Sequence, residues 1–301
     1  MVNLRINFHS MRTTLILLAI TCGILLPYGH DYTFLIHYLL ILMLFFSFLD
    51  ITIDKKIVTH QHFIILPLII VIATILFFII RVFNFDAAAA VFIAAIGPTA
   101  IAAPVIISIK KGNVGFVLFA LVLNNLTIAL LIPFLLPFLM GSDLNISVSQ
   151  ILLPVLLTFL IPFAAANGIK YLSDKTWNYL VKIKGINFYL LILNIYLATS
   201  KASYYIMNES PDHYNLILLI GILIAVTCTI LFSTGRLIGG KKHPEEASFS
   251  LGQKNNGFTI WLALTYMNPV SVIGPIFYVL FQNIYISYKL YLDNKLRKQT
   301  A

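Results

Sequence analysis

The sequence alternates between long apolar stretches and short polar segments. Most of the apolar stretches contain about twenty residues, the length that an α-helix needs to cross the hydrocarbon core of a bilayer. A transmembrane β-barrel would instead show segments of roughly ten residues with alternating character. The pattern predicts ten membrane-spanning helices, at residues 12–28, 32–50, 61–82, 86–110, 113–140, 149–171, 183–206, 214–237, 244–268 and 270–291.

The composition supports an all-α polytopic membrane protein. Of the 301 residues, 60% are hydrophobic and 10% charged, with a mean hydropathy of +0.94. A soluble chain is nearer half apolar and a quarter charged. No hydrophilic stretch is long enough for a soluble domain, so the function must lie within the membrane part. Cys22 and Cys228 both lie in apolar spans, which predicts neither a disulfide framework nor a metal or cofactor site.

The positive charges are concentrated on one side of the predicted membrane topology and do not form a basic patch of the kind that binds nucleic acid. The net charge is +9, and 17 of the 20 Lys and Arg residues fall in the termini and alternate loops on one side of the predicted topology. The opposite side has only Arg81 and Lys201. By the positive-inside rule, both termini are predicted in the cytoplasm, with the helices in the plasma (inner) membrane. The lipid bilayer is then the large partner, and nucleic acid is not expected.

Ten spans divide into two halves of five, residues 1–140 and 141–301. Because five is odd, a duplicated five-helix unit would insert in opposite orientations. This predicts two inverted five-helix repeats, a plan that is common among secondary transporters. The prediction of a repeat is supported by position, because in each half it is the fourth span that contains residues unusual for a membrane helix.

The fourth span contains Gly97, Pro98 and Pro104 within eight residues. Each proline removes a backbone hydrogen bond and clashes with the preceding turn. In lipid, the freed backbone groups must be satisfied by protein, water or ligand. The pair of prolines beside a glycine favours a broken helix, and the alternative is a simple proline kink.

The ninth span begins at Pro244 and is interrupted by the run Gly252-Gln253-Lys254-Asn255-Asn256-Gly257. A charged residue near the centre of a membrane helix costs about 2.5–3.5 kcal/mol on insertion scales, so Lys254 must be shielded from lipid. A second broken helix satisfies this requirement. The alternative is a cytoplasmic loop followed by a shortened span at 258–280.

Interrupted fourth spans in both halves indicate the binding site of a transporter. The N-termini of half-helices carry partial positive charge and free N–H groups. Together with Lys254, they predict a small organic anion as the substrate. Asn124, Asn125, Gln282 and Asn283 lie within the fifth and tenth spans, where amides either support such a site or only join neighbouring helices.

Three other polar residues are expected to have no direct role in the binding site. His37 and Thr158 lie in spans without a broken helix and are expected to be packing residues. His62 lies at a predicted membrane edge and is expected to face solvent.

Three motifs resemble the bile acid:sodium symporter family. They are Pro98…Pro104-Val105…Lys111-Gly112-Asn113-Val114, then Gly252…Asn255…Gly257, and Pro269-Val270…Phe281-Gln282-Asn283. The resemblance implies a core domain from spans 3–5 and 8–10 and a panel domain from spans 1, 2, 6 and 7. It implies that the fourth and ninth helices cross at their breaks and that substrate binds between core and panel.

The resemblance also places individual residues. By position, Asn255 and Asn283 match asparagines near the family's substrate, and Ala100 and Ile101 match the fourth-helix crossing. The family's sodium ligands, however, are missing. A glutamate and a glutamine of the ninth span are replaced by Ser250 and Lys254. An asparagine of the fourth span is replaced by Pro104, and hydroxyl residues of the fifth by Val117 and Leu121. The chain therefore resembles a divergent member without the usual sodium site.

Lys254 has two interpretations. Its ammonium could occupy the space of the missing cation and brace the two broken helices through carbonyl oxygens. Because burial disfavours the charged form of a lysine, it could instead gain and lose a proton and couple transport to protons.

The sequence thus predicts a secondary active or facilitated transporter of small organic anions, working by alternating access without tight sodium coupling. The predicted substrate-binding residues are Thr99, Ala100, Ile101, Asn255, Asn256, Gln282 and Asn283. The helix-break residues are Gly97, Pro98, Pro104, Gly252, Gln253 and Gly257, with Lys254 as the cation substitute and Asn124, Asn125 and Ser250 as polar support.

Three alternatives remain open. A sodium symporter could hold its ions through Asn124, Asn125, Gln253 and backbone carbonyls. A channel or a non-transporting sensor is the alternative from another class, although polarity concentrated in two breaks suits a midplane binding site better. An intramembrane enzyme would need a nucleophile–base pair or a metal cluster inside the spans, and the sequence shows neither.

Overall fold

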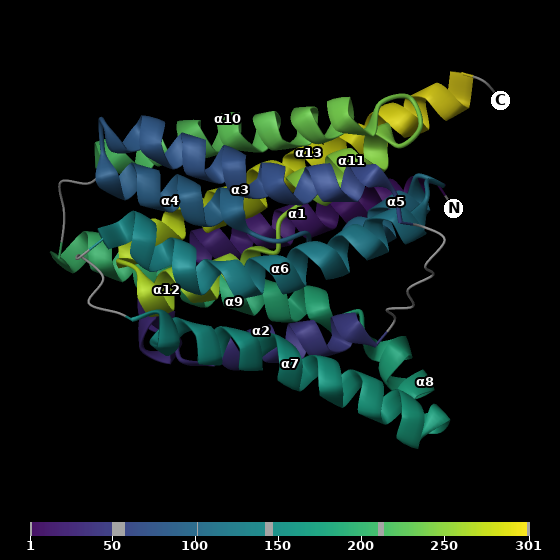
Figure 1. Cartoon of the computed structure of the whole chain (residues 1–301), viewed down its shortest axis with the longest axis horizontal. Helices are drawn as coiled ribbons and strands as arrows, with labels where there is room; N and C mark the ends of the chain where they lie inside the picture. Colours follow the sequence, from purple (N-terminus) through teal and green to yellow (C-terminus); the bar gives the residue numbers. More distant parts are fainter. Residues whose placement is uncertain (1, 50–57, 101, 142–146, 210–213, 300–301) are drawn as a thin grey trace.

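The computed structural model describes residues 2–49, 58–100, 102–141, 147–209 and 214–299, and these ranges contain helices and no β-strand (Figure 1). The helices are α1 (Val2–Leu25), η1 (Pro27–Tyr32), α2 (Leu35–Phe48), α3 (His60–Arg81), α4 (Phe85–Ile96), α5 (Ala102–Ile109), α6 (Val114–Met140), α7 (Val148–Leu172), α8 (Asp174–Ile183), α9 (Ile186–Glu209), α10 (Tyr214–Gly239), α11 (Pro244–Gly252), α12 (Asn256–Tyr266), η5 (Pro269–Val272) and α13 (Ile273–Gln299).

Five of the described helices are long and apolar enough to cross a membrane unaided. They are α3, α6, α7, α10 and the segment Pro269–Asp293. A sixth is added if α8 and α9, bent by 54°, count as one span. The predicted fourth and ninth spans are each divided into two short helices, α4 with α5 and α11 with α12. The protein is therefore an all-helical membrane protein with five or six continuous apolar spans, and the count of ten remains a prediction.

Several helices begin at a capping side chain. Asn84 Oδ1 accepts a hydrogen bond from Ala87 N (2.8 Å) at the start of α4, and Asn113 Oδ1 accepts one from Phe116 N (3.1 Å) at the start of α6. Such caps satisfy N–H groups that have no partner within the helix. At α3, a capping box joins Thr59 and His62.

The expectation that His62 faces solvent is wrong. Its side chain is fully buried, and its Nε2 lies 2.9 Å from the carbonyl oxygen of Phe116. Position relative to the membrane edge did not predict burial, because α6 covers this end of α3.

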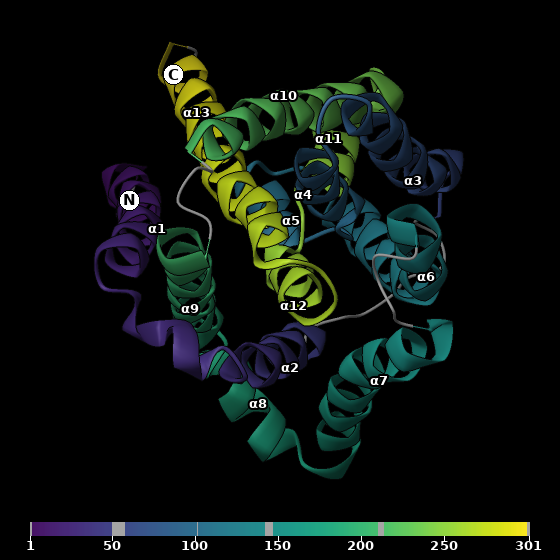
Figure 2. The ribbon, with the colours of Figure 1, turned by 90° about the vertical axis from the view of Figure 1, so that its left-hand side faces the viewer.

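The helices fall into two groups in space. Figure 2 shows α1, α2, α7, α8 and α9 as an arc along one side of the remaining helices. Within the arc, α1 packs on α9, and α2 packs on both α7 and α9. On the other side, α10 packs on α4, α11 and α13. The groups touch where α12 meets α2 and α9, where α13 meets α1 and α9, and where α6 meets α7.

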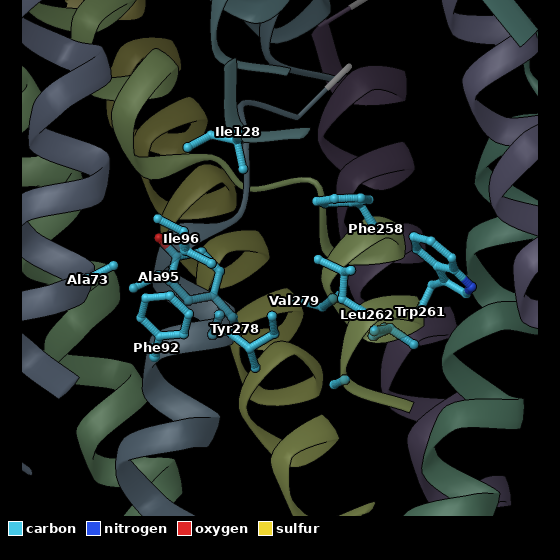
Figure 3. Close-up of a cluster of buried hydrophobic side chains, with 14 of the residues drawn as sticks. Ala73, Phe92, Ala95, Ile96, Ile128, Phe258, Trp261, Leu262, Tyr278 and Val279 are labelled. Carbon is cyan, nitrogen blue, oxygen red and sulfur yellow. The ribbon is translucent and has the colours of Figure 1, made fainter. Parts of the chain in front are cut away.

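The first half of the fourth span lies in the centre of the second group. Every residue of α4 from Ala87 to Ile96 is buried, between α3, α10 and α13. Figure 3 shows Phe92, Ala95 and Ile96 of α4 beside Tyr278 of α13. Small side chains allow this close approach: a Cβ added to Gly274 would lie 2.0 Å from the carbonyl oxygen of Ala90. The helix α4 therefore ends in the protein interior, and the segment that follows it is surrounded by protein rather than by lipid.

Candidate functional site

The two helix breaks lie against each other. Thr99, between α4 and α5, and Lys254, between α11 and α12, form an antiparallel bridge. Ala100 N donates to Gln253 O and Asn255 N donates to Pro98 O, both at 2.8 Å. Backbone groups that lose their helical partners must find others when no water is available. Here each break supplies partners for the other, which explains why two membrane helices can be interrupted at once.

Glycines allow the breaks to pack this closely. A Cβ on Gly97 would lie 2.9 Å from Thr259 Cγ2 and 3.4 Å from Lys254 Cβ. A Cβ on Gly252 would lie 2.4 Å from the ring of Phe232. Gly257 is less crowded, with Met43 Cε 3.3 Å from the corresponding point. The two glycines that end α4 and α11 are thus required for close approach.

Pro104 does not belong to the break. It is the third residue of α5, where a first-turn N–H has no helical acceptor and proline is tolerated. The prediction that Pro104 interrupts the helix is wrong for this reason. Ile101, predicted to bind substrate, lies outside the described residues.

Thr99 connects the first break to two other helices. Its hydroxyl donates to Ser250 O in α11 (2.6 Å) and accepts from Asn124 Nδ2 in α6 (2.7 Å). Asn125 Nδ2 donates to Thr99 O (3.0 Å). The two asparagines of the fifth predicted span therefore hold the first break in place.

The second break is held from α13 and by its own amides. Lys254 N donates to Gln282 Oε1 (3.0 Å), and the Tyr278 hydroxyl donates to Gly252 O (2.6 Å). Asn256 Nδ2 donates to Lys254 O (3.0 Å), and Asn255 Oδ1 accepts from Phe258 N (3.3 Å) to cap α12.

Asn283 and Tyr278 both lie on α13, and the role of Asn283 at the substrate stays a prediction. The amide of Asn283 donates to Val279 O in its own helix (2.7 Å), so the described contacts do not join it to the breaks. Tyr278 was not predicted, because a tyrosine in an apolar span is usually a packing residue and no local signal distinguishes it.

Seven buried polar atoms around the breaks have no hydrogen-bond partner among the described residues. They are Asn124 Oδ1, Asn125 Oδ1, Ser250 Oγ, Gln253 Oε1, Lys254 Nζ, Asn255 Nδ2 and Asn256 Oδ1. Leaving a buried polar group unpaired costs about 1–3 kcal/mol. A region with this many unpaired groups is suited to a polar ligand that provides the partners.

Lys254 is the one cation among these groups. Its side chain is 1% exposed, and its ammonium forms no hydrogen bond or ion pair with a described residue. The predicted brace through this ammonium is therefore not seen in the described part of the chain. The backbone of residues 253–255 joins the two breaks instead.

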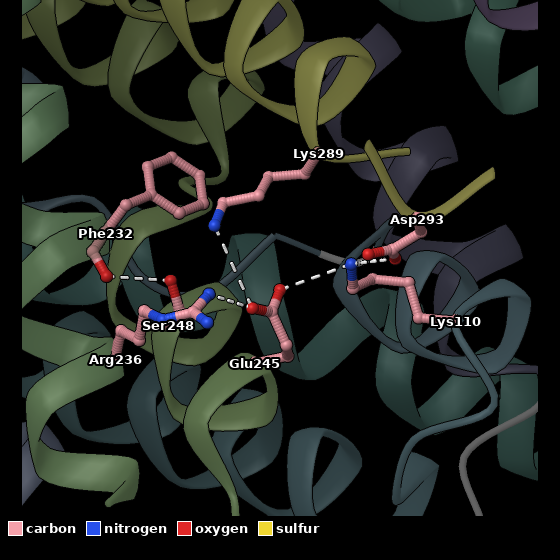
Figure 4. A network of polar contacts seen from close by, with 7 residues as sticks. All are labelled: Lys110, Phe232, Arg236, Glu245, Ser248, Lys289 and Asp293. Atoms are coloured by element: carbon pink, nitrogen blue, oxygen red, sulfur yellow. Dashed lines mark hydrogen bonds and ion pairs between the residues drawn. The ribbon is translucent and has the colours of Figure 1, made fainter. Parts of the chain in front are cut away.

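A separate network of charged side chains surrounds the start of α11 (Figure 4). Glu245 contacts Lys110 (3.3 Å), Lys289 (3.9 Å) and Arg236, and Lys110 also pairs with Asp293. Sequence reasoning missed this network, because its members lie up to 183 residues apart. It joins α11 to α10, α13 and the end of α5.

Comparison with known protein families finds one family whose model matches this chain. The model of the SBF-like CPA transporter family (DUF4137) matches residues 55–286, a range that includes both breaks and the surrounding helices. None of the curated proteins compared matches the chain.

Proposed function

The chain belongs to the SBF-like CPA transporter family, and on this premise we propose that it carries small organic anions across the membrane by alternating access. Its family and its apolar helices make it a membrane transporter of that kind. The substrate, the coupling and the mechanism are our proposal. We also propose that it lies in the plasma membrane with both termini in the cytoplasm, from the distribution of Lys and Arg.

The observation that carries the proposal is the group of unpaired polar atoms at the paired breaks. Lys254 supplies a positive charge, while Asn255 and Asn256 supply an unpaired donor and an unpaired acceptor. The N-terminus of α12 begins at the same place and adds partial positive charge. No described carboxylate forms an ion pair with Lys254, so an anionic substrate fits this combination better than a cation.

For the mechanism, we propose that the two groups of helices move against each other. The core would contain α3–α6 and α10–α13, and the panel would contain α1, α2, α7 and α9. Two inverted five-helix repeats, divided at residue 140, would generate this arrangement. The backbone pairs between the breaks and the network around Glu245 support a core that moves as one body.

Lys254 is proposed to take the place of a bound cation. Its ammonium would neutralise the substrate without requiring tight sodium coupling. If the same group also carries protons, uptake of an anion should depend on pH and Lys254→Gln should remove that dependence. Uptake by Lys254→Gln with unchanged pH dependence would eliminate proton coupling through Lys254.

One observation favours a second candidate, a sodium symporter. Asn124 Oδ1, Asn125 Oδ1, Ser250 Oγ and Gln253 Oε1 are buried oxygens without a described donor. Carbonyl and amide oxygens at unwound helices are the groups that hold sodium in several transporter folds. This candidate requires the ion to bind close to the ammonium of Lys254, which repels it.

The deciding experiment is thermal denaturation of the detergent-purified protein. Sodium chloride is titrated against choline chloride at constant ionic strength, and choline benzoate and choline succinate are titrated separately. A ligand that binds the folded state raises the melting temperature as its site fills. We expect saturable stabilisation by at least one carboxylate and none specific to sodium.

The other outcomes are equally informative. A saturable shift that is specific to sodium would favour the symporter. Stabilisation by tetramethylammonium chloride, without stabilisation by either carboxylate, would contradict the anion proposal. The variant Lys254→Gln is the control, because carboxylate stabilisation should weaken when the positive charge is removed.

A further inference from the structure

Three side chains from separate helices meet where the panel proposed above contacts α12. His37 of α2 stacks on Trp261 of α12, with ring centroids 4.7 Å apart and an interplanar angle of 16°. His37 Nε2 lies 2.9 Å from Thr158 Oγ1 of α7. Thr158 and Trp261 are 1% and 4% exposed. His37 and Thr158, both expected to be packing residues, are therefore polar partners of each other between α2 and α7.

The direction of the hydrogen bond follows from the second contact of Thr158. Its hydroxyl donates to Pro154 O, one turn earlier in α7, at 2.7 Å. A hydroxyl has a single proton, so Thr158 Oγ1 accepts from the N–H at Nε2 of His37. This bond fixes the orientation of the imidazole and holds its face against the indole. Thr158 is thus a positioning residue for the contact between His37 and Trp261.

Two more contacts lie along the same face of α12. Phe258 packs edge-on against Phe159 of α7, with centroids 5.0 Å apart, and Gly257 lies against Met43 of α2. Trp261 is three residues after Phe258 and four after Gly257, the spacings that place residues on one helix face. Figure 3 shows Phe258 and Trp261 on α12. One face of this short helix therefore makes a continuous seam with α2 and α7.

The seam covers only one half of the interrupted span. α12 runs away from the paired breaks toward Tyr266, whereas α11 begins at Pro244, beside the basic segment Arg236 to Lys242. α11 packs on α3, α5, α6 and α10, all in the proposed core, while α12 packs on α4 and α13 of the core and also on α2 and α9 of the proposed panel. The seam thus lies on the side opposite the basic loops, which is the outer side in the proposed orientation.

We propose that the stack of His37 on Trp261 is the outer gate of the transport pathway, and that the hydrogen bond from His37 to Thr158, which lies within the panel, keeps the imidazole in its stacked position. The proposal rests on the transport function proposed above. A substrate bound at Asn255 and Asn256 can leave toward the outer side along this seam only if α12 separates from α2 and α7. Opening must break the ring stack, whereas the network around Glu245, within the core, stays intact.

The test measures the distance across the seam with spin labels. Labels are attached at Ser149→Cys in α7 and Thr265→Cys in α12, both exposed positions near the outer ends of their helices. Cys22→Ser removes the exposed native thiol, and Cys228 is buried. Double electron–electron resonance of the full-length protein in detergent gives the distance distribution. The closed gate should give one short component in the starting protein.

Two threonines provide a matched pair of substitutions. Thr158→Val removes the acceptor of His37. Thr227→Val, in α10, removes a hydroxyl that is also 1% exposed and also donates to the carbonyl four residues earlier, Leu223 O at 2.7 Å. Only Thr158 contacts the proposed gate. His37→Leu is a second way to remove the same bond, in case Thr158→Val folds poorly.

We expect Thr158→Val and His37→Leu to add a longer-distance component, while Thr227→Val leaves the distribution unchanged. The open-to-closed ratio should rise by roughly two- to tenfold, the change produced by weakening one aromatic contact across the gate. Equal distributions in Thr158→Val and Thr227→Val, with His37→Leu also unchanged, would overturn the gate. The spin labels measure distance in the absence of substrate, so this test does not depend on the anion proposal. If the gate opens as expected but the protein binds no carboxylate, only the anion proposal is refuted.

Discussion

Thr99 and Lys254 are paired as an antiparallel bridge, although 155 residues separate them in the sequence. Each belongs to a segment where a membrane helix is interrupted, and each is held by a side chain from a further helix. Asn124 donates to the hydroxyl of Thr99, and Gln282 accepts from the backbone of Lys254. The pairing makes the site a single structural unit, and the contribution of each side chain to it can be tested by a single substitution.

Thr99→Val should destabilise the protein by about 1–3 kcal/mol, because it leaves Asn124 Nδ2 and Ser250 O buried without this partner. Chemical denaturation in detergent, followed by circular dichroism, measures the change. Thr227→Val is the control, since among the described residues its hydroxyl bonds to the carbonyl of Leu223 in its own helix. Equal losses for the two variants would show that Thr99 does not connect the breaks to α6.

Lys254→Met should make the ligand-free protein more stable by roughly 1–3 kcal/mol. The substitution replaces a buried, unpaired ammonium with an apolar side chain of similar length. The same variant should lose stabilisation by carboxylates, so stability and binding move in opposite directions. Thermal denaturation with and without choline benzoate measures both. A less stable variant would mean that the ammonium has a structural partner.

Gly274→Ala should destabilise the packing of α13 on α4 by at least about 1–3 kcal/mol, the usual cost of an overpacked core. The added Cβ would lie 2.0 Å from the backbone oxygen of Ala90, which cannot move without shifting α4. Gly168→Ala is the comparison, because a Cβ there meets nothing within 4 Å. It should stabilise α7 by about 0.4–1 kcal/mol. Thermal melts of the two variants should therefore shift in opposite directions.

Asp293→Asn should cost little, because it leaves Lys110 with Glu245, whereas Glu245→Gln should cost more, because Glu245 also pairs with Arg236 and Lys289. The double variant removes both of the carboxylates described above from a lysine whose side chain is only 5% exposed. We expect its loss of stability to exceed the sum of the single losses by about 0.5–3 kcal/mol, the range for residues of one network. A double-mutant cycle of unfolding free energies measures this coupling, and an additive result would show that the two pairs act independently.

The sequence determined where the chain is helical and where its helices are interrupted. Runs of apolar residues encode spans through local length and periodicity, and most helix bounds fall within a few residues of the prediction. The polar run from Gly252 to Gly257 and the pair Gly97-Pro98 marked the two breaks, because glycine, proline and buried charge disfavour a continuous membrane helix. Pro104 was misassigned, since proline has different effects in the first turn and in the interior of a helix.

Only the tertiary structure decided which residues meet. The bridge between Thr99 and Lys254, the contact of His37 with Thr158 and Trp261, and the network around Glu245 all join segments far apart in the chain. Local pattern carries no information on such partners, because they depend on how whole helices pack. For the same reason, His62 was expected in solvent and is buried. Helix formation depends on near neighbours in the sequence, whereas the polar partners of a membrane site depend on packing between distant ones.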